Sequence, residues 1–410
     1  MPDAPITTTC CIAGGGPAGM MFGFLLARAG IAVVVLEKHA DFFRDFRGDT
    51  IHPSTLELMH ELGLLDRFLK LPHQRLERLS IQVGDEQLRM IDLTHLPTHC
   101  KYVAMMPQWD FLNFVAACAK RYPSFDLRMQ TEATDLIEEN ARVVGVRARG
   151  PGGELTIRAD LVVAADGRHS TLRTRAGLQS DDYGAPMDVL WFRLPRRQSD
   201  EGETFGHIEM GVMLIMLDRG DYWQCAFVIP KGGIERIKAE GLEAFRERVV
   251  KLSPYLSDRV AELKTWDDIK LLSVTVDRLR QWWRPGLLCI GDAAHAMSPI
   301  GGVGINLAIQ DAVAAANRLA IPLKNGAVSV NDLRAIQDRR TLPVRLTQLL
   351  QLAIQNRVIS PALTGVAQPH PPLMFRLFNA IPVLRRIPAR FIGLGIRPEH
   401  IHTPDVLAAS

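Results

Sequence analysis

The sequence predicts an α/β protein in which a Rossmann-like nucleotide-binding domain carries an inserted β-sheet domain and a helical C-terminal segment. A run of β-branched and small residues, 8–13, leads directly into the glycine-rich segment Gly14–Gly19. Two later apolar runs also end in turns that contain Gly and Asp, and strand-like runs with a different rhythm lie between them. Strands that alternate with helices favour a parallel sheet, and the alternating runs favour a second sheet.

Length and composition are those of an ordinary globular chain. The 410 residues are 47% hydrophobic and 23% charged, with 48 Lys+Arg against 45 Asp+Glu. This composition excludes disordered, collagen-like and disulfide-scaffold chains, and we expect no metal and no nucleic-acid partner. Six scattered cysteines without a CxxC pair indicate reduced thiols in a cytoplasmic protein. No apolar run near the start is long enough to cross a bilayer.

The first βαβ unit contains the glycine loop. After residues 8–13 the chain passes through Gly14–Gly19 and continues as a helix to Arg28. Gly30 ends this helix, and residues 31–36 resume as an apolar strand. Strand, loop, helix and strand within this length are typical of a dinucleotide-binding unit.

The loop glycines have separate physical roles. Gly14 permits the tight turn, Gly16 lets the backbone approach a pyrophosphate, and Gly19 lets the helix pack closely on the sheet. The phosphates would then meet free N–H groups at the positive end of the helix. Glu37, directly after the second strand, can accept hydrogen bonds from a ribose and would repel a 2′-phosphate. The unit therefore favours FAD or NAD over NADP.

Two later motifs follow short apolar strands, Asp166-Gly167 after residues 155–165 and Gly291-Asp292 after residues 286–290. Asp292 also has a simpler interpretation as a helix N-cap. We expect His295, three residues further on, to be a packed, hydrogen-bonded structural residue.

Another glycine-rich segment, after these three motifs, opens a long helix. Pro299 precedes Gly301–Asn306, and the helix is expected to run to about Leu319. Free amides at Gly302–Asn306 would stabilise negative charge on a bound cofactor.

This set of motifs resembles the FAD-dependent monooxygenases of the para-hydroxybenzoate hydroxylase fold, the flavoprotein aromatic hydroxylases. The glycine loop, the Asp-Gly motif and the Gly-Asp motif occur in that family's order and at its spacing, and the resemblance covers roughly residues 8–320. The resemblance implies non-covalently bound FAD, NADPH or NADH as the electron donor, and O₂ as co-substrate. It implies hydroxylation or epoxidation of a small apolar, aromatic or quinone-like substrate through a flavin C4a-hydroperoxide.

The resemblance also implies where the cofactor binds. Asp292 should bind the ribityl chain of FAD, Asp166 should support the pyrophosphate region, and Arg47 should belong to the segment that covers the flavin. Gln108 falls where many members have Arg. The expected cofactor-binding residues are Gly14, Gly16, Pro17, Ala18, Gly19, Glu37, Lys38, Arg47, Gln108, Asp166, Gly291, Asp292, Pro299, Gly302, Gly304, Ile305 and Asn306.

The inserted sheet makes the FAD-binding domain discontinuous. Its clearest element is a predicted β-hairpin, with strands at residues 212–217 and 222–229 around the turn Asp218–Asp221. The expected domains are 1–78, 100–180 and 277–338 for FAD binding, 79–99 and 181–276 for the substrate-binding sheet, and 339–410 for a basic helical C-terminal segment.

Large apolar side chains in the inserted segment suggest an adaptable substrate chamber, although ordinary sheet core is an alternative for each of them. They are Met210, Met213, Met216, Trp191, Trp223 and Phe227. His52, His207 and Tyr222 are of a type that can deprotonate a phenol, but each is also readily explained as a structural polar residue. The sequence alone does not identify a catalytic acid or base.

Two other functions use the same cofactor motifs. One is a flavin-dependent reductase or dehydrogenase on the same fold, and the other is a non-catalytic flavin-binding module. A halogenase is disfavoured because the chain lacks a Trp-x-Trp-x-Ile motif.

The segment 339–398 is free of acidic residues. It holds nine Arg and no Lys, Asp or Glu, so that it carries +9 and the remainder carries 3 − 9 = −6. Residues 342–359 have helical apolar spacing, and 373–396 mix apolar residues with Arg in short pieces that Pro382 and Pro388 break.

Two interpretations of this segment stay open. It can lie on an anionic membrane surface, placing the enzyme at the inner face of the membrane, or it can pack on the FAD-binding domain or a second subunit. We expect a monomer or a homodimer.

Overall fold

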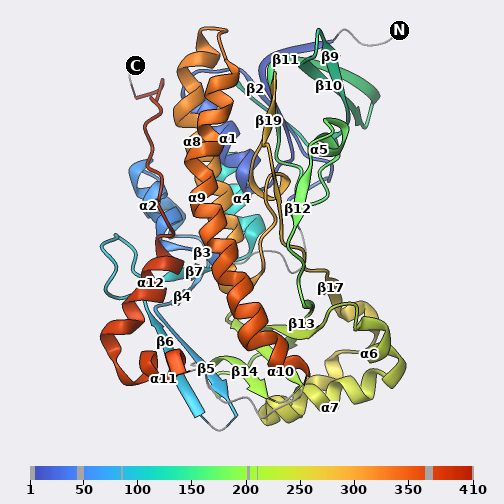
Figure 1. Cartoon of the computed structure of the whole chain (residues 1–410), viewed down its shortest axis with the longest axis vertical. Coiled ribbons are helices and arrows are strands. Elements are labelled where there is room, and N and C mark those ends of the chain that lie inside the picture. The colour runs from blue at the N-terminus through green and yellow to red at the C-terminus, as the bar shows by residue number, and fades with distance from the viewer. Residues whose placement is uncertain are drawn as a thin grey trace.

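The computed structural model describes residues 5–43, 50–84, 86–200, 204–209, 211–364 and 373–408. Two sheets lie one above the other in Figure 1. The long helix α8 (Gly304–Lys324) lies beside the upper sheet, and α9 (Val330–Ile354) runs from there down to the lower one. Each sheet draws strands from segments that are distant in sequence. The domain boundaries given above stay a prediction.

The first sheet has the strand order β19-β20-β11-β1-β2-β8. In addition, β10 pairs antiparallel with β11, and β9 pairs antiparallel with β10. The strands from β20 to β8 run parallel. Both faces of the second half of β1, residues 10–13, are buried, which explains why these four side chains are small or apolar. The strands are β1 (Ile6–Ala13), β2 (Val33–Leu36), β8 (Phe125–Arg128), β9 (Glu132–Glu139), β10 (Arg142–Gly150), β11 (Gly153–Ala164), β19 (Trp283–Arg284) and β20 (Leu287–Cys289).

Helices α1 (Pro17–Arg28) and α4 (Gln108–Ala119) cover one face of this sheet together with α8. The smaller elements around them are α2 (Pro53–Glu61), α3 (Leu65–Phe68), α5 (Thr171–Arg175), and the three-stranded sheet β3 (Thr50–Ile51), β7 (Val103–Met105) and β4 (Gln74–Leu76). Cys10 faces this core and Cys11 faces the opposite one. All six cysteines are buried and free, as expected.

The second sheet has the order β17-β13-β16-β15-β14-β5-β6. The predicted hairpin is confirmed: Asp218 pairs with Trp223, and Asp218 accepts a 2.7 Å hydrogen bond from the Gly220 amide in the turn. In Figure 1, helix α6 (Ile234–Glu240) lies to the right of this sheet and α7 (Leu242–Leu252) lies below it. The strands are β5 (Arg78–Val83), β6 (Glu86–Asp92), β13 (Met187–Pro195), β14 (Thr204–Glu209), β15 (Val212–Asp218), β16 (Tyr222–Pro230) and β17 (Lys270–Leu272), and a separate pair is formed by β12 (Ser180–Asp182) and β18 (Asp277–Leu279).

The C-terminal segment is helical, as predicted. A π-helical turn, Gln355–Ile359, and α10 (Ser360–Thr364) continue α9. Then come α11 (Leu373–Ala380), a 3₁₀ turn at Pro382–Arg385, and α12 (Arg386–Gly393). No helix in the described part of the chain is both long and apolar enough to cross a membrane.

Two helix boundaries differ from the prediction. Helix α8 continues to Lys324 instead of ending near Leu319, with Pro322 in its last turns. Pro382 does end α11, but Pro388 does not interrupt α12. It occupies the first turn of that helix, where its missing N–H would have no partner.

Candidate active site

The three sequence motifs meet at the ends of neighbouring parallel strands. The Ala165 amide donates to Ala13 O at 2.8 Å, and the Ile290 amide donates to Ala164 O at 3.0 Å. These bonds bring the glycine loop after β1, the Asp-Gly motif after β11 and the Gly-Asp motif after β20 to one edge of the sheet. Such an edge, at the carboxyl ends of parallel strands, is where open α/β sheets bind ligands.

Gly14 and Gly19 are required by close backbone packing. A Cβ on Gly14, whose φ is +105°, would lie 2.3 Å from Ala165 O, and a Cβ on Gly19 would lie 2.0 Å from Gly14 O. At Gly16 the φ is −74° and nothing lies within 4 Å of a Cβ position. Gly16 therefore faces open space, which leaves room for a ligand against the loop.

Glu37 holds the loop from the end of β2. Its side chain accepts hydrogen bonds from the Gly15 amide at 3.1 Å and the His39 amide at 3.0 Å. Lys38 points outward and lies 4.0 Å from Glu132. Pro17 is the first residue of α1, and Ala18 is buried beneath the loop.

Asp166 is half-buried, and one of its two carboxylate oxygens is buried without a hydrogen-bond partner among the described residues. Its Oδ2 accepts from the Leu172 amide at 3.2 Å, whereas its Oδ1 has no hydrogen-bond partner among the described residues. Burial raises the pKa of Asp166 above its ordinary value. A buried oxygen of this kind needs a donor, and a bound ligand or water can supply it.

The Asp292 side chain is partly exposed to solvent. Its side chain is 35% exposed, and Oδ2 lies 3.6 Å from Nη2 of Arg168, which comes from the Asp-Gly motif. The carboxylate is therefore only partly buried. The N-cap interpretation finds no support, since Ile290 is the capping position of the short 3₁₀ helix that contains Asp292. Gly291 is packed tightly, with a Cβ position 3.1 Å from Cβ of Ala18 and of Ala308.

The segment before α8 is held by Thr50. Gly302 has a φ of +62°, and Thr50 Oγ1 donates to Gly302 O at 3.0 Å. No side chain in the described structure caps α8, so its first amides, from Gly304 and Ile305 onward, remain available to an anion. Pro299 lies before this turn, and its carbonyl accepts from the Gly302 amide at 3.0 Å.

The side-chain oxygen of Asn306 makes hydrogen bonds within the protein: it accepts from the His52 amide at 3.1 Å and from Thr55 Oγ1 at 2.7 Å. Two other predicted positions are less informative. Gln108 begins α4, and its side chain makes no hydrogen bond with the described residues. Arg47 lies outside the described residues.

A buried charge network supports the Gly-Asp turn. Asp311 Oδ2 lies 2.6 Å from His295 Nε2 and accepts from the Gly291 amide at 3.1 Å, while Arg340 Nε donates to Asp311 Oδ1 at 2.9 Å. Arg340 also reaches Glu399 at 3.3 Å. His295 is structural, as predicted, but sequence reasoning missed Asp311 and Arg340. The missed signal was a lone carboxylate in the Ala- and Val-rich run of α8, since buried carboxylates are almost always paired.

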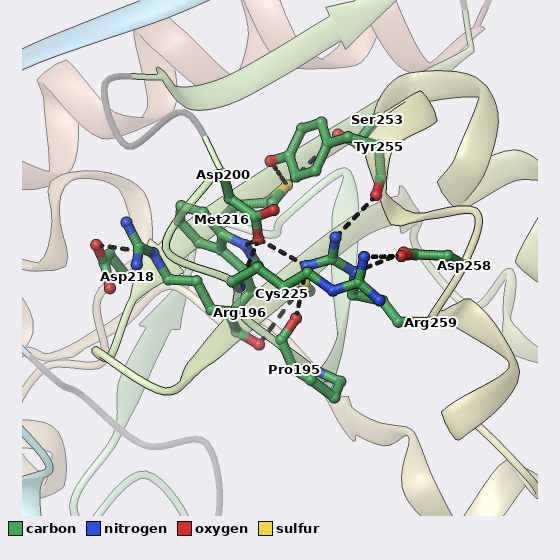
Figure 2. A network of polar contacts seen from close by, with 12 residues as sticks. Pro195, Arg196, Asp200, Met216, Asp218, Cys225, Ser253, Tyr255, Asp258 and Arg259 are labelled. Atoms are coloured by element: carbon green, nitrogen blue, oxygen red, sulfur yellow. Dashed lines mark hydrogen bonds and ion pairs between the residues drawn. The ribbon is translucent and has the colours of Figure 1, made fainter.

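The two faces of the second sheet have different neighbours. Met216, Trp223 and Phe227 pack with Phe245 and other residues of α7. Trp223 also donates from Nε1 to Asp200 at 2.8 Å, within the network that joins Asp200 to Arg259 (Figure 2). These three side chains are core, so the suggestion that they line a substrate chamber is wrong.

The opposite face carries the alternate residues of the same strands. Trp191 pairs across the sheet with Ala226, and Ala226 pairs with Ile215. Met213, on this same face, packs with Ile300 of the turn before α8. This face therefore lies toward the motif loops. Met210 is outside the described residues.

The three candidate bases are not gathered in one place. His52 is buried, its Nδ1 donates to Ile392 O at 2.7 Å, and burial lowers its pKa to about 4. His207 pairs with Leu214 and shares its face, which packs against α7, and burial lowers the pKa of His207 also. Tyr222 lies on the other face, with the Arg193 guanidinium 5.1 Å from its ring centre.

The family model of the FAD binding domain matches residues 7–348, which include all three motifs. The chain belongs to this family of FAD-dependent monooxygenases. It is 31% identical to the 6-methylpretetramide 4-monooxygenase of Streptomyces rimosus over 362 residues, 88% of this chain and 86% of the relative. It is 25% identical to the para-nitrophenol 4-monooxygenase of Pseudomonas sp. (strain WBC-3), over 77% of this chain and 78% of the relative.

Solved structures agree with the fold of this monooxygenase. An anhydrotetracycline hydroxylase from Streptomyces rimosus superposes with a TM-score of 0.76 at 21% identity, covering 95% of this chain and 76% of that chain. A p-nitrophenol 4-monooxygenase from Pseudomonas putida DLL-E4 gives 0.72 at 21% identity, covering 94% and 98%. The predicted α/β fold and family resemblance are confirmed. The named relatives give no support to a reductase or a non-catalytic flavin-binding module.

Proposed function

We propose that this monooxygenase hydroxylates a small apolar aromatic compound, with NADPH or NADH as electron donor. One atom of O₂ enters the ring as a hydroxyl group, the other leaves as water, and the nicotinamide and one proton supply the hydrogen. The convergence of the three motifs at one sheet edge carries the proposal. The names of its relatives, para-nitrophenol 4-monooxygenase among them, support an aromatic substrate.

FAD would lie along the sheet edge, with its pyrophosphate against Gly16 and the first turn of α1. Glu37, at the end of β2, is placed to meet the adenosine ribose. Asp166 and Asp292 are proposed to accept hydrogen bonds from the pyrophosphate-proximal and ribityl parts of the cofactor. The open space at Gly16 and the unpartnered Oδ1 of Asp166 both fit this placement.

Bound FAD supplies the redox chemistry, since it can take two electrons from nicotinamide and pass them to O₂. The chain provides the surroundings. The amides at the start of α8 are proposed to stabilise negative charge on the reduced ring system, which favours reduction. His52 would be neutral near pH 7, since its pKa is about 4, and would fix the position of α12 through Ile392.

The aromatic substrate would lie between the motif loops and the face of the second sheet that carries Trp191, Met213 and Ile215. These side chains offer an apolar, partly polarizable surface, which suits a planar ring. Because such a surface excludes water, it would prevent side reactions of the reactive oxygen with water. No side chain is proposed as the base.

The test combines product and donor measurements on the FAD-loaded protein. NADPH and NADH oxidation is followed in air with a panel of phenols, and products are identified by mass spectrometry. The proposal expects a product heavier by one oxygen atom, formed only in the presence of O₂, and donor oxidation that accelerates with a fitting substrate. Fast donor oxidation that is indifferent to every phenol and yields only hydrogen peroxide would refute it.

A further inference from the structure

The helices at 373–393 expose a set of large apolar side chains, which we call the C-terminal patch. Its six members are between 42% and 74% exposed: Leu373, Met374, Leu377, Ile381, Val383 and Ile387. The first three follow the i, i+1, i+4 spacing of one face of α11, and Ile381 comes directly after the last residue of that helix. Phe375 lies on the opposite face of α11 and is buried.

The helices that carry the patch pack against the second sheet. In Figure 1, α11 and α12 flank the edge strand β6. Asn379 accepts a hydrogen bond from the Arg89 amide of β6 at 3.1 Å. Arg385 folds back onto the end of α11 and donates to Phe378 O at 2.8 Å and to Asn379 O at 2.5 Å. The apolar face is therefore part of an ordered hairpin.

Unpaired positive charge accompanies the patch. Arg386 and Arg390 are exposed on α12, and neither makes an ion pair within the described part of the chain. Arg376 pairs with Glu86 at 3.3 Å, but both side chains are about half exposed, so this pair is weak. No Asp or Glu occurs anywhere between residues 339 and 398.

We propose that the C-terminal patch docks on the surface of an anionic lipid bilayer. The apolar side chains would enter the boundary between headgroups and acyl chains, and Arg386 and Arg390 would lie against anionic headgroups. An apolar face bordered by arginines, in a segment that has no acidic residue of its own, is complementary to such a surface in both hydrophobicity and charge.

Docking would place the candidate active site beside the membrane. The inner side of α12 reaches the turn before α8, because a Cβ on Gly301 would lie 3.6 Å from Ile392 Cδ1. That this position delivers an apolar substrate rests on the proposed function. Docking itself does not, and it is measured without turnover.

The experiment is co-sedimentation of the FAD-loaded full chain with vesicles of phosphatidylcholine, alone or mixed with phosphatidylglycerol, at low and high salt. We expect binding to the mixed vesicles that high salt weakens, and little binding to phosphatidylcholine alone. Absence of binding to the mixed vesicles at low salt would overturn the proposal.

Two double variants test the patch itself. Arg386→Gln with Arg390→Gln should lower the vesicle partition coefficient about 25-fold, at about fivefold for each arginine. Val383→Ser with Ile387→Ser should lower it about tenfold or more. Bound FAD and the thermal unfolding midpoint should stay unchanged in both, since the four side chains are exposed.

Matched controls lie elsewhere in the same helical segment. Arg345→Gln with Arg357→Gln removes the same charge, and Leu342→Ser with Leu349→Ser removes exposed apolar groups from α9. Both controls should bind vesicles like the unaltered protein. Equal loss in patch and control variants would overturn the assignment. So would patch variants that keep vesicle binding but convert a dimer to a monomer in light scattering, because the patch would then be a subunit interface.

Discussion

Gly16 and Gly19 lie three residues apart and are glycine for different physical reasons. Gly19 has no room for a side chain because of Gly14 O, whereas Gly16 is open and has a backbone conformation that alanine adopts freely. We expect Gly16→Ala to leave the stability of the apoprotein unchanged while weakening FAD binding. Gly19→Ala should lower the unfolding midpoint of the apoprotein. Thermal unfolding with and without FAD separates the two effects, and a Gly16→Ala protein that binds FAD normally would contradict the proposed pyrophosphate position.

Asp292 provides a second test at the residue scale. Losing its charge-assisted hydrogen bonds by Asp292→Ala should cost on the order of 1.5–3 kcal/mol of FAD binding, or roughly 10- to 150-fold in Kd. Flavin-fluorescence titration of the apoprotein measures this. Asp267→Ala, an exposed carboxylate on the second-sheet side, is the control and should bind FAD normally. An unchanged Kd for Asp292→Ala would remove Asp292 from the proposed site.

Sequence reasoning was most successful at this scale where chemistry depends on spacing along the chain. Gly14, Gly19 and the Gly-Asp turn are recognisable because each is followed by a helix or strand of the expected length. The accessibility of Asp292 was not predictable, because it depends on Arg168, which is more than a hundred residues away in the chain.

At the element scale, the network around Asp311 joins β20, α8 and α9. Burial alone would raise the pKa of Asp311, but His295 and Arg340 outweigh it and hold that pKa below its ordinary value. Removing one partner by Arg340→Met leaves a buried charge incompletely paired and should cost about 3–5 kcal/mol. Urea unfolding at neutral pH measures the loss. Arg345→Gln, an exposed arginine on the same helix, is the control and should stay within about 0.5 kcal/mol.

The same network gives a pH dependence. A carboxyl whose folded pKa is depressed stabilises the protein above its unfolded pKa of about 3.9, and this contribution is lost as pH falls through the folded value. The unaltered protein should therefore lose stability more steeply below about pH 4 than Arg340→Met does. Parallel acid-unfolding curves for the two proteins would contradict the assignment.

The two faces of the second sheet lead to opposite predictions for two tryptophans. Trp223→Ala opens a cavity against α7 and removes one of the hydrogen-bond donors to Asp200, so it should cost about 3–5 kcal/mol of stability. Trp191→Ala, on the face toward the motif loops, should cost less stability. It should also raise the substrate KM and divert more of the donor's electrons to hydrogen peroxide. Urea unfolding and peroxide assays test both, and a Trp191→Ala enzyme with unchanged coupling would place the substrate elsewhere.

The sequence identified the hairpin strand that carries Trp223, but it did not define the strand of Trp191 or show which face of the sheet lies toward the motif loops. Side chains alternate along a strand, so the parity of each position was predictable within β13, β15 and β16. Which parity lies toward the motif loops depends on where α7 packs, and that is determined by contacts between elements distant in sequence. The chamber prediction mixed both faces for this reason.

At the scale of the whole molecule, the two parts of the C-terminal segment differ in how they are packed. Arg339 and Arg340 bind Glu399, and Arg340 reaches Asp311, so this part of the segment belongs to the folded core of the FAD-binding sheet. The helices at 373–393 instead carry the exposed patch. The nine arginines in the sequence gave no means to separate these roles, because a charge count does not show which side chains are buried.

The whole-molecule function is tested most directly with isotopically labelled O₂. The FAD-loaded enzyme is supplied with NADPH or NADH, labelled O₂ and a phenol that accelerates donor oxidation, and the product is analysed by mass spectrometry. The account predicts one labelled oxygen atom per hydroxylated product and an unlabelled product when the label is in water instead. Oxygen drawn from water, or donor oxidation without any oxygenated product from every aromatic compound tried, would contradict it.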